Sequence, residues 1–69
     1  MTHTPVTSST IDSVGYDPEG RTMRVAFKSG KTYEYSDVAP ETHRALVNAP
    51  SVGAHFGKHI RPHYTGSKL

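Results

Sequence analysis

The segment Thr32-Tyr33-Glu34-Tyr35-Ser36 decides the fold, because it lies at the middle of the chain and alternates aromatic with polar residues. Successive side chains of a β-strand leave opposite faces, so Tyr33 and Tyr35 share one face. The two rings are either core residues beneath a helix or a surface that stacks on unpaired bases. We favour the core, because the same face is the one available to receive the apolar residues of the later helices.

The segment before it alternates in the same way and forms the other half of a hairpin. Met23, Val25 and Phe27 alternate with polar or small residues. A three-residue loop pairs Val25 with Tyr33 and Met23 with Tyr35, which gathers the large side chains on one face. A two-residue loop would place apolar residues opposite polar ones. We therefore expect the three-residue loop.

The turns and the first strand complete a meander. Residues 11–16 are the first strand, and a bulge at Gly15 would reconcile the spacing of its apolar residues. Residues 17–20, Asp-Pro-Glu-Gly, predict a type I turn with a left-handed exit at Gly20. In the next turn, Gly30 takes the left-handed position of a bulged hairpin.

Two short helices follow the strands. Pro40 suits the first turn of a helix that runs to about Asn48, and Ser51 is the expected N-cap of a second helix that Pro62 ends. An apolar stripe at spacings of four runs along the second helix: Val52, Phe56 and Ile60. The sequence thus predicts an α+β fold, a three-stranded antiparallel β-meander followed by two short helices packed on one face.

The length of 69 residues limits the chain to one small domain. We expect a flexible lead-in over residues 1–7, a single domain over 8–65 and a frayed end over 66–69. The sequence has no cysteine, and no segment resembles a signal peptide or a membrane span. We therefore expect a cytoplasmic protein without a membrane partner.

Charge is distributed unevenly along the chain. Residues 1–50 hold five Lys/Arg against six Asp/Glu, a net charge of −1, whereas residues 51–69 hold Lys58, Arg61 and Lys68 without an acid, a net charge of +3. This basic third can meet phosphates or an acidic protein surface. Alternatively, these cations only complement the dipole at a helix C-terminus.

Turn, aromatic and apolar residues at fixed spacing extend through nearly the whole chain. They are Ser8, Ile11, Val14, Gly15, Tyr16, Asp17, Val25, Phe27, Gly30, Tyr33, Tyr35 and Val38, followed by Pro40, Leu46, Ala49, Ser51, Gly53, Phe56, Ile60, Arg61 and Tyr64. This pattern resembles the KTSC domain, a family named for its occurrence at the C-terminus of some lysyl-tRNA synthetases. The resemblance implies a small domain, also found alone in bacterial and phage proteins, for which RNA binding has been suggested. Two positions depart from the family: His43 replaces an aromatic or apolar residue, and Gly57 replaces a common asparagine.

The basic C-terminal helix is the best candidate for a functional surface. Lys58 and Arg61 lie three residues apart, with His55 and His59 near the same face and Tyr64 able to add stacking. Such a surface contacts phosphates without reading sequence. The alternative for Arg61 is an ion pair with a carboxylate such as Asp17.

The histidines invite a metal interpretation, because His55, His59 and His63 are spaced by four. No cysteine or neighbouring carboxylate completes such a site, so we expect a solvated helix face, no metal and no cofactor. A nucleophile with an orienting partner is also missing from the sequence, so we expect no catalytic residue and no enzyme.

The sequence therefore predicts a non-enzymatic binding module for RNA or single-stranded nucleic acid, using Lys58, Arg61, Tyr64, His55 and His59. The alternative is a protein–protein interaction module, such as a phage- or host-encoded adaptor or inhibitor that docks on an acidic protein surface. A third, purely structural role would be self-association.

Overall fold

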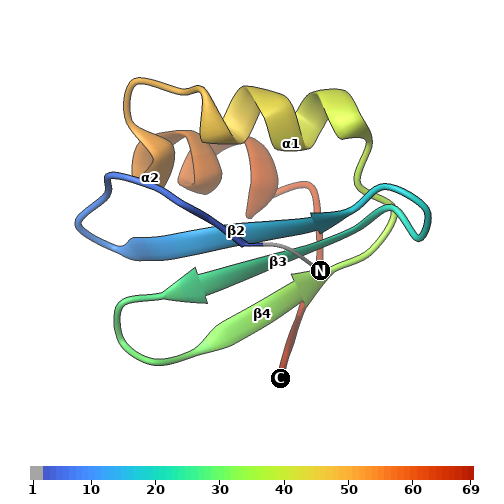
Figure 1. Cartoon of the computed structure of the whole chain (residues 1–69), viewed down its shortest axis with the longest axis horizontal. Coiled ribbons are helices and arrows are strands. Elements are labelled where there is room, and N and C mark those ends of the chain that lie inside the picture. The colour runs from blue at the N-terminus through green and yellow to red at the C-terminus, as the bar shows by residue number, and fades with distance from the viewer. Residues whose placement is uncertain (1–2) are drawn as a thin grey trace.

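The computed structural model describes residues 3–69, which form a sheet of five strands. Two helical segments cover one face of this sheet, as Figure 1 shows above its three central strands. The strands are β1 (His3–Pro5), β2 (Ile11–Asp17), β3 (Thr22–Phe27), β4 (Thr32–Tyr35) and β5 (Gly66–Lys68). They are antiparallel in the order β1-β2-β3-β4-β5. The helices are α1 (Pro40–Val47) and α2 (Val52–His55), and α2 continues directly into the π-helical turn η1 (Phe56–Ile60). The predicted α+β class is confirmed.

The expectation of three strands is wrong, because the described residues add a short strand at each edge of the meander. β1 pairs with β2, and β5 pairs with β4. They come from the two terminal segments that we expected to lie outside the sheet, the lead-in and the frayed end. Residues 1 and 2 of that lead-in lie outside the described residues. Both strands satisfy backbone groups at the sheet edges while exposing most of their side chains, so no apolar alternation marks them.

The central hairpin has the predicted register. Val25 lies opposite Tyr33, and Met23 lies opposite Tyr35. The backbone N–H of Gly30 donates to the carbonyl of Phe27 at 3.0 Å, and Gly30 has a φ of +94°. This left-handed conformation is the one that glycine adopts at least cost, which confirms the three-residue loop.

Two local details differ from the expectation. The bulge of β2 falls between Ile11 and Ser13, whereas Gly15 pairs regularly with Arg24. Asp12 is the extra residue, and it brings the apolar side chains of β2 to one face. The strand therefore has the bulge that its spacing predicts, but nearer its start than Gly15.

The turn between β2 and β3 is also longer than expected. Asp17 pairs with Thr22, and the left-handed residue is Arg21, with a φ of 53°, instead of Gly20. The Asp17 carboxylate accepts the backbone N–H of Glu19 at 3.1 Å, which holds the start of the turn.

The helices begin as predicted. Pro40 is the first residue of α1, which ends at Val47 with Asn48 as its C-cap, and the Ser51 hydroxyl accepts the Ala54 backbone N–H at 3.4 Å. The stripe Val52, Phe56 and Ile60 is 4%, 7% and 0% exposed. None of the helices formed by residues 3–69 is long and apolar enough to cross a membrane.

The two tyrosines of β4 have different environments. Tyr35 is 5% exposed and belongs to the core with Leu46, Phe56 and Ile60, which confirms the core interpretation for this ring. Tyr33 packs against the core but stays half-buried. The second ring is thus part of the fold and is also accessible from outside.

Candidate functional site

The second helix ends in a widened turn that positions the basic residues. In η1 the backbone N–H of Arg61 donates to the carbonyl of Phe56, five residues earlier, at 3.0 Å. An α-helix would pair it with the residue four earlier, so the π turn changes the direction in which the next residues point. The chain then turns through Tyr64, whose N–H donates to the Ile60 carbonyl at 2.9 Å, before it enters β5. Phe56 and Ile60 remain buried while Arg61 emerges at the surface.

Arg61 and Tyr64 line a cleft between the end of this helix and the β3–β4 hairpin. Its volume is about 370 Å³, and we call it the aromatic cleft. The residues that line it are Phe27, Ser29, Lys31, Tyr33, Tyr35, Phe56, Arg61, Tyr64 and Gly66. The cleft thus joins segments far apart in the sequence, and its described lining contains two cations and no acid.

The rings of the aromatic cleft support one another through edge-to-face contacts. Tyr33 meets Phe27 at a centroid distance of 5.8 Å and an interplanar angle of 86°. Phe27 meets Phe56 at 5.5 Å and 75°, and Phe56 meets Tyr35 at 5.7 Å and 73°. This chain of contacts runs from the hairpin into the core, so the cleft wall has fixed geometry.

Gly66 closes one side of the aromatic cleft by lying directly against Tyr35. A Cβ atom at this position would lie 2.7 Å from Cε1 and 3.0 Å from the hydroxyl of that ring. Glycine is therefore required for β5 to approach the tyrosine.

Burial has a larger effect than the cleft cation Arg61 on the pKa of the Tyr35 phenol, which lines the aromatic cleft. The pKa of the Tyr35 phenol is raised by burial and by Tyr33, and Arg61 opposes this by lowering it. Within residues 3–69 the ion pairs join Arg21 to Asp37 and Arg24 to Glu34. The alternative of an Arg61–Asp17 pair does not occur, since Asp17 accepts from the turn backbone instead.

The histidines lie in a second hollow on the α1 side, which we call the histidine hollow. Its volume is about 360 Å³, and its lining is Glu41, Thr42, Ala45, His55, His59, His63 and Tyr64. The His55 and His59 ring centroids are 4.5 Å apart. The pKa of His55 is lowered by burial and then by His59. Over residues 3–69, no group of three or more His, Cys, Asp or Glu is arranged to hold a metal ion.

The structure therefore divides the five residues selected from sequence. Arg61 lies in the aromatic cleft, His55 and His59 lie in the histidine hollow, and Tyr64 lines both. Lys58 is exposed and lines neither. Sequence reasoning missed Lys31 and did not connect Tyr33 with Arg61. The register of the hairpin was a usable signal for Tyr33, but the approach of the hairpin to the helix end was not visible in the sequence.

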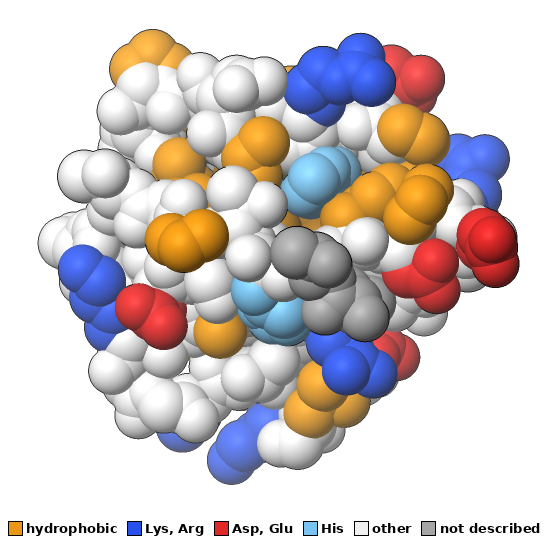
Figure 2. All heavy atoms as spheres, viewed as in Figure 1, with side chains coloured by type: hydrophobic (Ala, Val, Ile, Leu, Met, Phe, Trp, Pro, Cys, Tyr) orange, Lys and Arg blue, Asp and Glu red, His pale blue; other side chains and the backbone are white. Residues whose placement is uncertain are grey.

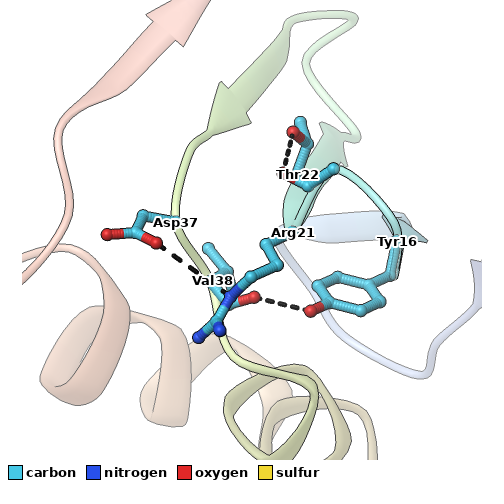
Figure 3. Close-up of polar contacts among 6 residues, drawn as sticks. Tyr16, Arg21, Thr22, Asp37 and Val38 are labelled. Carbon is cyan, nitrogen blue, oxygen red and sulfur yellow. Dashed lines mark hydrogen bonds and ion pairs between the residues drawn. The ribbon is translucent and has the colours of Figure 1, made fainter.

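A third cluster of aromatic and charged side chains lies where the chain passes from the sheet to α1, and we call it the corner (Figure 3). The Tyr16 hydroxyl donates to the Val38 carbonyl at 2.5 Å. The backbone N–H of Val38 donates to the Arg21 carbonyl at 2.8 Å. The Arg21 guanidinium lies 4.0 Å from the Asp37 carboxylate. These contacts tie the β2–β3 turn to the start of α1.

His43 covers the Tyr16 ring of the corner from α1. The two rings stack at 4.7 Å with an interplanar angle of 9°. The Nε2 atom of His43 is buried, and no described residue hydrogen-bonds to it. Burial, and then Arg44, lowers the pKa of this imidazole, so the corner favours its neutral form.

Figure 2 shows how charge is arranged on one face of the molecule, viewed as in Figure 1. Lys and Arg side chains appear there at separate places around the rim, several of them beside an acidic side chain. This mixed pattern is that of an ordinary solvated surface. It contrasts with the acid-free lining of the aromatic cleft.

The sequence profile of the KTSC domain matches residues 7–64, so this chain belongs to the KTSC domain family. The crystal structure of a KTSC domain protein from Yersinia pestis has a TM-score of 0.94 and 34% identity to this chain, covering 99% of this chain and 96% of that one. An uncharacterized protein of Stutzerimonas stutzeri is 43% identical over 65 residues, which is 93% of this chain and 92% of that protein.

A lysine–tRNA ligase of Nostoc punctiforme contains a similar segment. It is 38% identical over 61 residues, which is 88% of this chain but only 11% of the ligase. The family therefore occurs both as a small protein and as a minor part of a much larger enzyme.

Proposed function

We propose that this domain is a non-enzymatic module that binds RNA or single-stranded nucleic acid through the basic end of its second helix. The observation that carries the proposal is the meeting of Arg61 and Tyr64 with Lys31 in one cleft whose described lining holds no acid. Lys and Arg contact phosphates in this way, and the resulting affinity is largely independent of sequence.

The relatives give this proposal its biological context. Lysine–tRNA ligases carry a segment like this domain, and their name makes tRNA one of their substrates. A segment that covers 11% of such an enzyme is suited to an accessory role in holding nucleic acid. Cytoplasmic location fits the same proposal.

Lys58, His55 and His59 extend the proposed surface beyond the aromatic cleft. Lys58 is exposed on the same helix and supplies a further phosphate contact. Burial lowers the pKa of His55, so its imidazole is mainly neutral at neutral pH and becomes cationic only in more acidic solution. Affinity for nucleic acid should therefore rise as the pH falls below 6.5.

The proposal is tested by charge reversal at Lys58 and Arg61, with binding of a labelled single-stranded RNA measured over a range of salt concentrations. We expect each reversal to weaken binding and to reduce the slope of log affinity against log salt by about 0.7 per lost contact. Arg44→Glu is the matched control, because it makes the same change in net charge at an exposed residue that lines neither hollow.

Equal losses from all three variants, or no binding of wild type at low salt, would refute the proposal. Pull-down with and without nuclease separates it from the protein-interaction alternative. A partner that survives nuclease treatment and depends on Lys58 and Arg61 would show that the basic surface recognises an acidic protein instead.

A further inference from the structure

The accessible rings of the aromatic cleft offer more than phosphate contact. Tyr33 and Tyr64 are half-buried, so each ring is anchored in the fold while part of it faces outward. At about 370 Å³ the cleft is at the small end of the usual range for ligand sites, about 300–1,000 Å³. It has room for one small, flat group with a charged substituent.

The stacking surface is prepared before any ligand arrives. Tyr33 is held by the edge-to-face chain through Phe27 and Phe56 to Tyr35. A fixed aromatic wall loses little conformational entropy on binding, so stacking contributes more of its energy to affinity. Aromatic side chains contribute about 1–3 kcal/mol for each base that they stack on.

The cations of the aromatic cleft come from two different elements. Lys31 immediately precedes β4, whereas Arg61 follows η1. No carboxylate within residues 3–69 forms an ion pair with either of them. A ligand that combines a planar ring with a phosphate matches both features of this lining.

Resting on the proposed function, we propose that the aromatic cleft holds a single unpaired nucleotide, with its base against Tyr33 and Tyr64 and its phosphate near Lys31 and Arg61. The base-paired part of the same RNA then lies outside the cleft, against the exposed side of the second helix that carries Lys58. Stacking accepts every base, so the site recognises the absence of pairing and shows little sequence preference.

The test compares two labelled RNA duplexes that differ only in one unpaired 3′ adenosine. Fluorescence anisotropy gives the affinity of the wild-type protein for the duplex with the overhang and for the blunt duplex. We expect the overhang to bind about 10-fold more tightly, as one stacked base predicts. Tyr33→Leu should bring this ratio close to one, and Tyr33→Phe should retain it because the ring remains.

The ratio of the two affinities separates this inference from the proposed function. Lys58→Glu should weaken both duplexes equally and leave the ratio unchanged. If wild type binds both duplexes with equal affinity, the single-nucleotide site is wrong while phosphate binding stands. If it binds neither duplex nor a single-stranded oligoadenylate at low salt, the proposed function fails as well.

A second measurement uses the wild-type protein only, so its result does not depend on whether a variant folds. Adenosine monophosphate should shift the ring resonances of Tyr33 and Tyr64 in NMR spectra of the wild-type protein, whereas inorganic phosphate should leave the ring of Tyr33 unchanged. Equal shifts from both probes would show a site for phosphate alone. If an acidic peptide shifts the ring resonances of Tyr33 and Tyr64 and adenosine monophosphate does not, the cleft binds a protein ligand instead.

Discussion

The corner and the aromatic cleft use the same kinds of side chain in different ways. In the corner, Tyr16 donates to the Val38 carbonyl, its ring is covered by His43, and Arg21 lies beside Asp37. In the cleft, no described residue forms a hydrogen bond or ion pair with the side chains of Tyr33 or Arg61.

This difference separates residues that stabilise the fold from residues that remain available to a ligand. A tyrosine and an arginine near each other are not in themselves a site. Their existing partners decide whether a change affects stability or binding. Substitutions in the corner should therefore change stability alone. Loss of the Arg61 charge should change binding alone, because no described carboxylate pairs with it, whereas loss of the Tyr33 ring should change both, because that ring also packs against Phe27.

The largest effect on stability is expected where the cleft meets the sheet. Gly66→Ala would place a Cβ atom 2.7 Å from Cε1 of Tyr35, so the ring or β5 must move. Overpacking of this kind costs about 1–3 kcal/mol, which urea denaturation would detect. The matched control is Gly57→Ala, since a Cβ atom there meets nothing within 4 Å and should leave stability unchanged or raise it slightly. A Gly66→Ala protein as stable as wild type would show that the cleft wall is loose.

Removing one hydroxyl from each region sharpens the comparison further. Tyr16→Phe leaves the Val38 carbonyl without its donor and should lower the free energy of unfolding by about 1 kcal/mol without changing RNA affinity. Tyr33→Phe should leave stability unchanged, because no described residue pairs with that hydroxyl. Equal losses in the two variants, measured by urea denaturation, would remove the distinction between the regions.

The corner should also make stability depend on pH. The pKa of His43 is lowered by burial and then by Arg44, so the folded state binds fewer protons than the unfolded state. The free energy of unfolding should therefore be greatest above pH 6.5 and fall as the pH drops below that value. His43→Phe retains a stacked ring without a titrating group and should make this decline shallower, leaving the contribution of His55. A pH profile identical to that of wild type would contradict the role of His43.

The smallest effect is expected from the charged pair of the corner. Arg21 and Asp37 lie 4.0 Å apart, with side chains that are 52% and 93% exposed. Such surface pairs contribute about 0–1 kcal/mol, so Asp37→Asn should change the free energy of unfolding by no more than that. Thermal denaturation at low and high salt would measure this contribution. A larger loss would mean that the ion pair with Asp37 helps to hold Arg21 in its left-handed conformation.

The central hairpin and the apolar faces could be predicted from sequence because their periodicities are strong. Only a three-residue loop brings the large side chains of both strands to one face, and this requirement alone places Val25 opposite Tyr33 and Gly30 in its left-handed position. The edge strands could not be predicted in this way, since β1 and β5 contribute backbone hydrogen bonds and few buried side chains. The left-handed residue is Arg21 because Asp17 pairs with Thr22 and leaves residues 18–21 in the loop, a strand register that the turn residues alone do not specify.

The candidate site was predictable only in part. The acid-free C-terminal segment indicated Arg61 and Tyr64. Lys31 remained hidden because its meeting with Arg61 depends on how the hairpin packs against the end of η1. The π turn, which sets the direction of the residues after Ile60, has no periodic signal of its own.

The most direct test of the central claim is an NMR titration of the isotope-labelled protein with a short single-stranded RNA at low salt. We predict that chemical shifts change most at Lys31, Tyr33, Arg61 and Tyr64, while the rings of Tyr16 and His43 stay unchanged. Changes that concentrate in the corner or on the outer face of the sheet, with the aromatic cleft unaffected, would contradict the account.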